Sequence, residues 1–324
     1  MKRRNIVVIG ASAGGVSALQ KLFAQLSGSL EASFFVVLHL APQSHSVLAE
    51  LLNRAGPLEA KTAVDGEPIQ PSKIYVAPPD AHLLVKSGYV HLHKGPRENR
   101  HRPAIDPLFR SAAVAYNSQV VGIVLTGLLD DGTSGLLAIK RCGGIAIAQH
   151  LADAEYPDMP QSAILTGQVD HQVPIQQMGA LIKDLVQTPA SEIEAIPKDI
   201  AMEVKIAEKT MSNIALENNL GQLVPISCPD CGGPLWSLKT DMVRRYRCHV
   251  GHGFTAKALL ASQDSTLEQA LWIAMRTLEE RANLSKMMAE DELRRGRGKS
   301  AQVYQEQADM YRTNAQVIRR LLAS

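Results

Sequence analysis

The chain has 324 residues, with 34 basic and 32 acidic side chains, 4% aromatic residues and four cysteines. A length of this order allows about two domains. The balanced charge gives no electrostatic reason to expect nucleic acid or a membrane surface as a partner. Four cysteines are too few for a secreted disulfide scaffold of this length. The composition therefore predicts a globular protein whose core is built from Val, Ile, Leu and Ala.

The N-terminal segment predicts a buried strand rather than an export signal. Basic residues at positions 2–4 precede an apolar run, but the run from Ile6 to Ile9 has only four residues, whereas a secretory core needs about 7–15. No apolar run in the chain reaches the roughly 18 residues of a membrane helix. We therefore expect a cytoplasmic protein without membrane insertion.

Residues 1–187 alternate between short apolar runs and helical patterns. The apolar runs predict strands at Ile6–Ile9, Phe34–Leu38, Ile74–Val76, Val120–Leu125 and Ile145–Ala148. The helical patterns lie between them, at Val16–Leu26, Val47–Arg54, Pro107–Tyr116 and Gly135–Cys142. Buried strands separated by helices indicate a doubly wound α/β fold with a mostly parallel sheet. A hairpin of Leu83–Val85 and Val90–Leu92 would make that sheet mixed.

The rest of the chain divides into three segments. Residues 188–224 predict a linker with a polar helix through Asp199–Glu217, residues 225–260 carry a cysteine cluster, and residues 265–324 are helical. Two apolar stripes at helical spacing lie in the last segment. They comprise Leu267, Leu271, Ala274, Leu278 and Ala282, and then Tyr304, Ala308, Tyr311, Ala315, Ile318 and Leu322. The Arg- and Gly-rich residues 294–299 separate the stripes, which predicts a helical hairpin.

Polar residues follow three of the predicted strands. Ser12 lies in Gly10–Gly14, which fits the G-x-S-x-G pattern of a nucleophile elbow, although such a turn is also typical of a phosphate cradle. His39 ends the second strand, and Asp130 and Asp131 follow the strand at Val120–Leu125. Each of these, taken singly, is explained by packing or turn formation. Because the carboxyl ends of parallel strands share one edge of a sheet, they can converge as nucleophile, base and orienting carboxylate.

The sequence resembles the CheB-type protein-glutamate methylesterases over about residues 4–187. The resemblance is carried by five motifs in the family's order: Gly10–Gly15, His39 with Pro42, His101–Ser111, Leu125–Gly132 and Met159-Pro160. It implies a serine hydrolase that acts on methylated glutamates of chemoreceptors or similar signalling proteins, with glutamine deamidation left open.

Carried over motif by motif, the resemblance implies Ser12 as the nucleophile, His39 as the base and Asp131 as the orienting carboxylate. The family places its aspartate directly before the glycine of the turn, which selects Asp131 over Asp130. No metal or organic cofactor is needed for this chemistry. The oxyanion would be held by backbone N–H groups of Ala13 and of the Gly127–Leu129 turn.

Two features depart from the family's pattern. CheB enzymes of the two-domain kind begin with a phosphoryl-accepting receiver domain, whereas here the catalytic strand starts at Asn5. We therefore expect a stand-alone form that is not controlled by a receiver of its own. The family's turn commonly reads Thr-Gly-Met-Gly, and here Leu128-Leu129 replaces Met-Gly.

The cysteine cluster predicts a structural zinc site. Cys228 and Cys231 form a C-x₂-C pair, Cys248 follows after 16 residues, and His252 lies four residues beyond it. Three thiolates and one imidazole suit tetrahedral Zn²⁺, and metal binding would stabilise a segment of about 35 residues that has too small a core to fold alone. The alternatives are reduced structural cysteines, and His249 in place of His252. Some stand-alone CheB-like proteins carry a similar tail ending in Cys-x-Val-Gly-His, which favours zinc.

Three other segments suggest surfaces for partners. The basic stretch Arg244–Arg247 is interpreted as a solvated strand of the zinc module rather than as a nucleic-acid patch. The loop Lys94–Arg102, opposed only by Glu98, is predicted either to dock a glutamate-rich receptor or to be merely solvated. Residues 265–324 would present an apolar face to the zinc module, to a second copy of the chain or to a signalling partner.

Two other functions remain as alternatives to the esterase. A nucleotide-binding protein would use the glycine-rich turn, but no acidic ribose-binding residue lies about 20 residues after it. A non-catalytic signalling adaptor would act through the zinc module and the helices. The intact set of Ser12, His39 and Asp131 argues against an adaptor.

Overall fold

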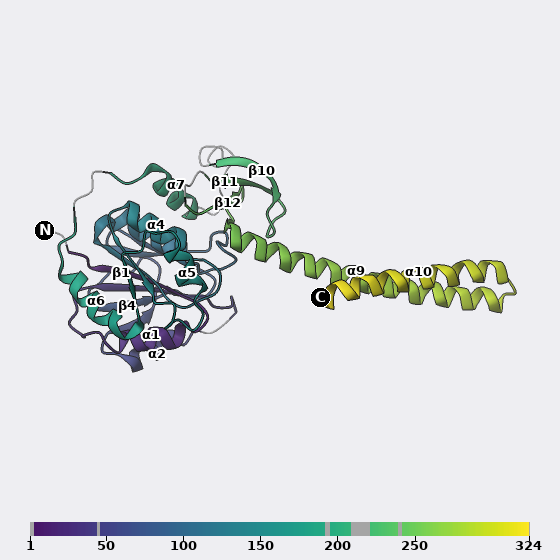
Figure 1. Cartoon of the computed structure of the whole chain (residues 1–324), viewed down its shortest axis with the longest axis horizontal. Helices are drawn as coiled ribbons and strands as arrows, with labels where there is room; N and C mark the ends of the chain where they lie inside the picture. Colours follow the sequence, from purple (N-terminus) through teal and green to yellow (C-terminus); the bar gives the residue numbers. More distant parts are fainter. Residues whose placement is uncertain (1–2, 44–45, 192–194, 209–220, 239–241, 324) are drawn as a thin grey trace. The chain divides into compact units, whose positions relative to one another are not determined.

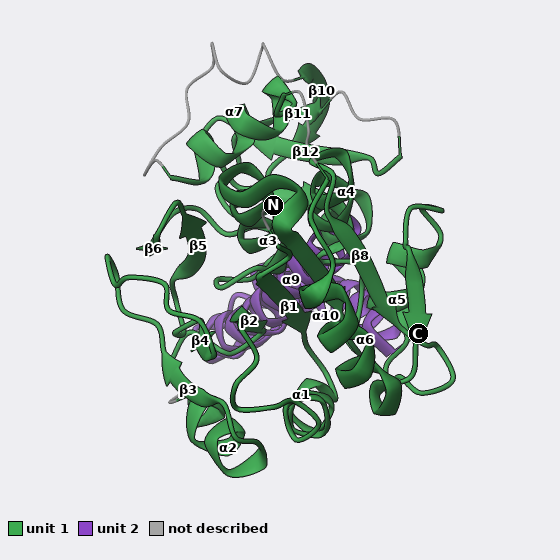
Figure 2. Cartoon of the chain, turned by 90° about the vertical axis from the view of Figure 1, so that its left-hand side faces the viewer, with its two compact units in different colours: residues 1–259 green, residues 260–324 purple. Residues whose placement is uncertain are grey.

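The computed structural model describes residues 3–43, 46–191, 195–208, 221–238 and 242–323 (Figure 1). The chain divides into two compact units, unit 1 at Met1–Leu259 and unit 2 at Leu260–Ser324 (Figure 2). Among the described residues, no helix is both long enough and apolar enough to cross a membrane.

Unit 1 is built around a seven-stranded sheet in which all neighbouring strands pair in parallel, in the order β3-β4-β2-β1-β7-β8-β9. The strands are β1 (Ile6–Ala11), β2 (Ser33–Leu38), β3 (Glu59–Thr62), β4 (Lys73–Val76), β7 (Val120–Val124), β8 (Ile145–Gln149) and β9 (His171–Val173). Every residue of β1, β2 and β7 is buried. These strands read as continuous apolar runs because helices cover both faces of the sheet.

The helices of unit 1 pack in two layers. The core on one face contains side chains of α1 (Gly15–Phe23), α2 (Leu48–Ala55) and α6 (Ile175–Gln187). The core on the other face contains side chains of α3 (Ile105–Tyr116), α4 (Thr133–Arg141) and α5 (Asp158–Ile164), together with the buried thiol of Cys142. A short 3₁₀ turn at Asn117–Gln119 leads into β7. The doubly wound α/β fold predicted from the sequence is confirmed.

Two details of the predicted sheet are wrong. The hairpin, β5 (His82–Lys86) and β6 (Tyr89–His93), forms a sheet of its own, so the main sheet is not mixed. The edge strands β3 and β9 were not predicted. They read Glu-Ala-Lys-Thr and His-Gln-Val, and short edge strands that are partly exposed carry little of the apolar signal by which the central strands are recognised.

A small antiparallel sheet follows helix α7 (Lys198–Ala207) in unit 1. Its strands pair in chain order: β10 (Gly221–Ser227), β11 (Pro234–Leu238), β12 (Arg245–Cys248) and β13 (Gly253–Thr255). We call residues 221–255 the Cys-His module. Of the predicted polar helix through Asp199–Glu217, residues 209–217 lie outside the described residues. Figure 2 shows α7 beside this sheet.

Unit 2 is a helical hairpin of α9, which begins at Ala256 and ends at Arg294, and α10 (Gly298–Ala323). The predicted interruption at residues 294–299 is the turn between them. The buried apolar side chains of unit 2 are seven residues apart within each helix, and they are Met275, Ala282 and Ala289 in α9 and Ala301, Ala308 and Ala315 in α10. A seven-residue repeat keeps one stripe of each helix at the seam. Leu267, predicted to belong to the apolar stripe of α9, is instead 59% exposed.

Candidate active site

Ser12, His39 and Asp131 come together at the carboxyl-terminal edge of the parallel sheet. They follow β1, β2 and β7, which are adjacent in the order β2-β1-β7. His39 Nδ1 lies 3.2 Å from Ser12 Oγ, and His39 Nε2 lies 2.8 Å from Asp131 Oδ2. The His39 and Asp131 side chains are only 6% and 3% exposed. The arrangement is a continuous hydrogen-bonded chain from a hydroxyl through an imidazole to a carboxylate.

The partners of the His39 ring define its tautomer. A proton on Nε2 donates to Asp131, which leaves the lone pair of Nδ1 directed at the Ser12 hydroxyl. In the familiar serine-protease arrangement the two ring nitrogens have the opposite partners. The chemistry is unchanged, because either nitrogen can accept a proton while the other is held by the carboxylate.

Asp131 is buried in a cage of hydrogen-bond donors. Besides His39, its oxygens accept the backbone N–H of Ile105 at 2.7 Å, the backbone N–H of Asp106 at 3.2 Å and the side-chain amide of Asn99 at 2.8 Å. Burial by itself would raise the pKa of Asp131. The hydrogen bond and charge of His39, together with the other donors, outweigh burial and hold this pKa below its usual value. The carboxylate therefore stays ionised beside the imidazole.

Asp130 has a different partner from Asp131, although the two are neighbours in the chain. Its Oδ1 accepts the hydroxyl proton of Thr255 at 2.6 Å, and Thr255 belongs to strand β13 of the Cys-His module. Burial is the main cause that raises the pKa of Asp130. The two adjacent carboxylates thus have different partners, one in the sheet edge and one in the module.

A second imidazole, that of His101, lies flat against the ring of His39. The ring centroids are 3.7 Å apart and the planes differ by 6°. Burial is the main cause that lowers the pKa of His101 to about 3, and the charge of His39 adds to it. His101 is therefore neutral near pH 7. The sequence placed His101 in a motif, but neither its stacking nor the contact of Asn99 with Asp131 was predicted.

Gly127 allows the turn after β7 to approach the serine. A Cβ at this position would lie 2.2 Å from Met159 Sδ and 2.8 Å from Ser12 Cβ. The Gly127 N–H donates to the Tyr156 carbonyl at 2.9 Å. Of the predicted oxyanion donors, the Gly127 N–H is thus already engaged, which favours those of Ala13, Leu128 and Leu129.

Leu129 occupies the position where the family commonly has glycine. Its φ of 63° lies in the left-handed region, which costs a leucine more than a glycine. Its carbonyl accepts the Ser162 hydroxyl at 3.2 Å, and Ser162 also accepts a hydrogen bond from Lys257 at 3.0 Å. The turn beside Ser12 therefore keeps a glycine-like conformation without a glycine.

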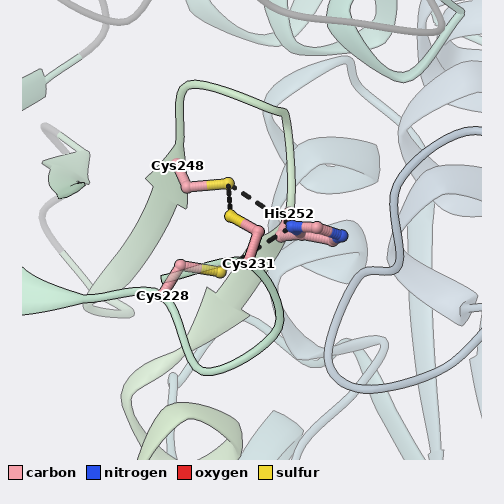
Figure 3. A group of neighbouring side chains, drawn as sticks. All are labelled: Cys228, Cys231, Cys248 and His252. Atoms are coloured by element: carbon pink, nitrogen blue, oxygen red, sulfur yellow. Dashed lines mark hydrogen bonds between the residues drawn. The ribbon is translucent and has the colours of Figure 1, made fainter. Parts of the chain in front are cut away.

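The structure also brings together the four predicted metal ligands. Cys228 and Cys231 lie in the turn between β10 and β11, Cys248 ends β12, and His252 directly precedes β13 (Figure 3). Their ligand atoms all lie within 4.8 Å of one another. The Cys231 and Cys248 sulfurs are 3.7 Å apart, and His252 Nδ1 is 3.5 Å from Cys248 Sγ and 3.7 Å from Cys228 Sγ.

These separations fit a tetrahedral metal site. Zn–S bonds of about 2.3 Å and a Zn–N bond of about 2.0 Å require S–S and S–N separations of roughly 3.8 and 3.5 Å. The other ring nitrogen of His252 lies 3.9 Å from an Asp230 carboxylate oxygen, so that a carboxylate stands behind the imidazole. The nitrogen of this group comes from His252 and not from the alternative, His249. The cluster has the donor set to hold a metal ion.

The basic stretch Arg244–Arg247 is not the solvated strand that was expected. Arg245 and Arg247 are only 8% and 2% exposed. Arg245 forms two hydrogen bonds with Glu203 of α7, at 2.5 and 2.6 Å, and Arg247 lies 3.0 Å from Glu98. These guanidinium groups therefore fasten the module to the α/β domain and are not presented to nucleic acid.

The basic loop Lys94–Arg102 is also more neutral than its sequence indicates. Arg102 donates to Asp80 at 2.6 and 2.9 Å, and Lys94 lies 3.7 Å from the same carboxylate. Glu98 is buried between Arg110 and Arg247. The expectation that only Glu98 opposes the positive charge is wrong, because Asp80 reaches the loop from another segment.

Comparison with known proteins identifies the family of the α/β domain. The CheB methylesterase family matches residues 7–182, more than half of the chain. The chain belongs to this family. Residues beyond 182 are outside the match.

Curated relatives are similar over the same region. A protein-glutamate methylesterase/protein-glutamine glutaminase of Yersinia pseudotuberculosis is 37% identical over 182 residues, which are 55% of this chain and 52% of the relative. One of Pyrococcus horikoshii is 35% identical over 188 residues, 57% and 51% of the two chains. The chain thus spans about half the length of the curated relatives it matches. The crystal structure of the Thermotoga maritima CheB methylesterase catalytic domain has 34% identity and a TM-score of 0.56, and covers 57% of this chain and all of that domain.

Proposed function

We propose that the protein is a protein-glutamate methylesterase that hydrolyses glutamate methyl esters on chemoreceptors or similar signalling proteins. The observation that carries this proposal is the hydrogen-bonded chain of Ser12, His39 and Asp131 at one edge of the sheet. The same acyl transfer would release ammonia from a glutamine side chain, as the names of the curated relatives suggest. Residues 1–187 would form the catalytic domain and residues 188–224 a linker. Residues 225–260 would form the metal module and residues 265–324 the hairpin.

The reaction proceeds in two acyl-transfer steps. Ser12 Oγ attacks the ester carbonyl while its proton passes to His39 Nδ1, and Asp131 stabilises the imidazolium through Nε2. Backbone N–H groups beside Ser12, those of Ala13 and the Leu128–Leu129 turn, hold the oxyanion. The C–O bond breaks and methanol leaves with the proton from His39. Water then attacks the acyl-enzyme by the same route, which regenerates the Ser12 hydroxyl and releases the glutamate.

The esterase proposal is tested by labelling with a fluorophosphonate, which reacts with activated serines. We expect labelling of the wild-type chain and none of Ser12→Ala, and release of methanol from a methylated receptor by the wild type alone. Ser17→Ala, a change in helix α1, is the matched control and should label normally. Equal labelling of wild type and Ser12→Ala would show that another serine reacts and would remove the proposal.

We also propose that Cys228, Cys231, Cys248 and His252 bind one structural Zn²⁺. The support is the thiolate and imidazole donor set and the separations between its atoms. All four positions are used by protein ligands, so the ion would stabilise the fold and take no part in ester hydrolysis. We expect about one zinc per chain in protein purified under reducing conditions, and loss of zinc in Cys228→Ser but not in Cys142→Ser. Full zinc occupancy in Cys228→Ser would contradict this ligand set.

A further inference from the structure

Asn99 connects the candidate active site to the Cys-His module. Its side-chain amide donates to Asp131 at 2.8 Å and to Asp106 at 2.9 Å. Its side-chain oxygen accepts the Thr255 backbone N–H at 2.9 Å, and its own backbone N–H donates to the Gly253 carbonyl at 2.8 Å. Asn99 is 4% exposed. One end of this side chain therefore holds the carboxylate behind His39, and the other end is held by strand β13.

The backbone around Asn99 depends on such outside support. Asn99 and Arg100 have φ angles of 49° and 73°, in the left-handed region that most residues avoid. Two consecutive residues of this kind persist only where the surrounding structure holds them. The next residue is His101, whose ring is stacked on His39. The segment from Glu98 to His101, which we call the support loop, thus contacts both His39 and Asp131.

A buried cluster of charges fixes the module to the support loop. Glu98 is paired with Arg110 of α3 and with Arg247 of β12, and all three side chains are at most 6% exposed. The Gly253 N–H donates to the Arg97 carbonyl at 3.2 Å. A buried ion pair that loses one partner is strongly destabilised. The loop therefore depends on β12 and β13 remaining in place.

The metal ligands lie next to these contacts in the chain. Cys248 follows Arg247 directly, and His252 directly precedes Gly253. The core of the module contains few residues besides its cysteines, such as Leu235 and Phe254. So small a core gives little stability without a metal. Occupation of the Cys-His cluster would thus determine whether β13 stays against the support loop.

We propose that the Cys-His module is a positioning element of the esterase, in which a bound metal keeps β13 on the support loop so that Asn99 holds Asp131 and His101 holds His39. This inference rests on the proposed esterase function. Asn99 and His101 act here as positioning residues, because they act through Asp131 and His39. Loss of the metal would free the loop, remove one donor from Asp131 and lower kcat. The KM for a small neutral ester would change little.

The first experiment removes the metal. In Cys228→Ser, or in wild type treated with a chelator, we expect at least tenfold slower fluorophosphonate labelling of Ser12. Labelling should be restored when Zn²⁺ alone is added back to the chelated wild type. Hydrogen exchange at the Asn99 N–H, which donates to Gly253, should speed up in parallel, whereas exchange in the central strand β1 should not change. Cys142→Ser is the matched control.

The second experiment tests the link while keeping every metal ligand. Thr255→Val deletes the hydroxyl that donates to Asp130, and Asn99→Ala deletes the amide that holds Asp131. We expect both to lower kcat for a small ester while zinc content is retained. The matched controls Thr166→Val and Asn53→Ala, whose side chains bond backbone carbonyls elsewhere in the domain, should keep the wild-type rate. The loss in Asn99→Ala/Cys228→Ser should be smaller than the product of the two single losses, because both act on Asp131.

The outcomes separate this inference from the proposed function. If wild type is not labelled at Ser12, the esterase proposal fails and the inference falls with it. If wild type is labelled at Ser12, the esterase proposal stands. If the metal-free protein and Thr255→Val are then labelled as fast as wild type, and the Asn99 N–H is still protected from hydrogen exchange in both, the inference alone is wrong. Fully multiplicative losses in the double variant would also contradict it, because they would show that the module acts by a route other than Asn99.

Discussion

Adjacent carboxylates at the end of β7 illustrate how one residue's place in the fold decides its chemistry. Asp131 accepts from His39 and from Asn99, whereas Asp130 accepts from Thr255. Both are buried, at 2% and 6% exposure. Burial disfavours the charged form of either group, and only Asp131 has enough donors to reverse that effect.

This difference predicts unequal effects of two otherwise identical substitutions. Asp131→Asn should lower kcat by about 10⁴-fold, because an amide no longer holds the productive tautomer of the imidazole. Asp130→Asn should lower kcat far less, because the Asp130 side chain bonds Thr255 of the module and not His39. The measurement is kcat for methanol release, with circular dichroism to verify folding. A larger loss in Asp130→Asn would mean that the two roles are exchanged.

The contact between α7, α3 and β12 shows how secondary-structure elements are joined by charge. Glu203 of α7 is paired with Arg245 of β12 and lies 3.7 Å from Arg110 of α3. Burial by itself would raise the pKa of Glu203, but the two guanidinium groups outweigh it and lower the pKa to about 2. The same balance, with Arg110 and Arg247, holds the pKa of Glu98 well below its usual range.

A lowered carboxylate pKa makes stability depend on pH in a defined direction. The contribution of Glu203 is complete above its unfolded pKa of 4.5 and is lost as pH falls toward 2, a loss of about 3 kcal/mol. The free energy of unfolding in urea, measured between pH 5 and pH 2, should fall by that much less in Glu203→Gln than in wild type. In Glu50→Gln, a change on the exposed face of α2, the free energy of unfolding should fall between pH 5 and pH 2 as much as in wild type. An equally large fall in Glu203→Gln would contradict the pairing of Glu203 with the guanidinium groups.

Asp106 is predicted to act in the opposite direction, over a pH range that extends higher than that of Glu203. Burial and the neighbouring charge of Asp131 raise the pKa of Asp106 to about 7. Its contribution is therefore complete below its unfolded pKa of 3.8 and is lost as pH rises from there through about 7. The two ranges overlap between 3.8 and 4.5, but Asp106 is present in both wild type and Glu203→Gln, so its contribution cancels when the two proteins are compared.

At the scale of the whole molecule, the two units have separate cores. The cores of unit 1 are made by residues up to Leu259. The seam of unit 2 is made by small side chains such as Ala282 and Ala308, each at most 1% exposed. Larger apolar side chains of the hairpin, among them Trp272 and Met310, are about half exposed. Each unit therefore contains a packed interior of its own.

Truncation after Ala261 should leave unit 1 folded and Ser12 labelled at the wild-type rate, because no core cluster of unit 1 includes a residue beyond Leu259. Light scattering of the full and truncated chains measures whether the hairpin mediates self-association. Slower labelling of the truncated chain at unchanged zinc content would show instead that the hairpin supports the active site.

Much of the site could be predicted from the sequence, because its signals are local. Ser12, His39 and the aspartate pair each follow a recognisable strand, and parallel strands bring their carboxyl ends to one edge. The spacing of the three cysteines and His252 is typical of a metal site. The interruption at residues 294–299 indicates a hairpin in the same way. Each of these inferences needs only a few neighbouring residues and a known element type.

Only the tertiary structure decided which distant side chains meet. Asn99 and Thr255 are 156 residues apart, and Glu98 and Arg247 are 149 apart. In the sequence, Arg247 has the pattern of an exposed basic strand and Asn99 that of a loop residue, because their partners leave no periodic signal. The burial of a charge depends on the docking of one element against another, which is a property of the folded chain. For this reason the sequence indicated the candidate catalytic and metal sites separately, and only the fold joined them.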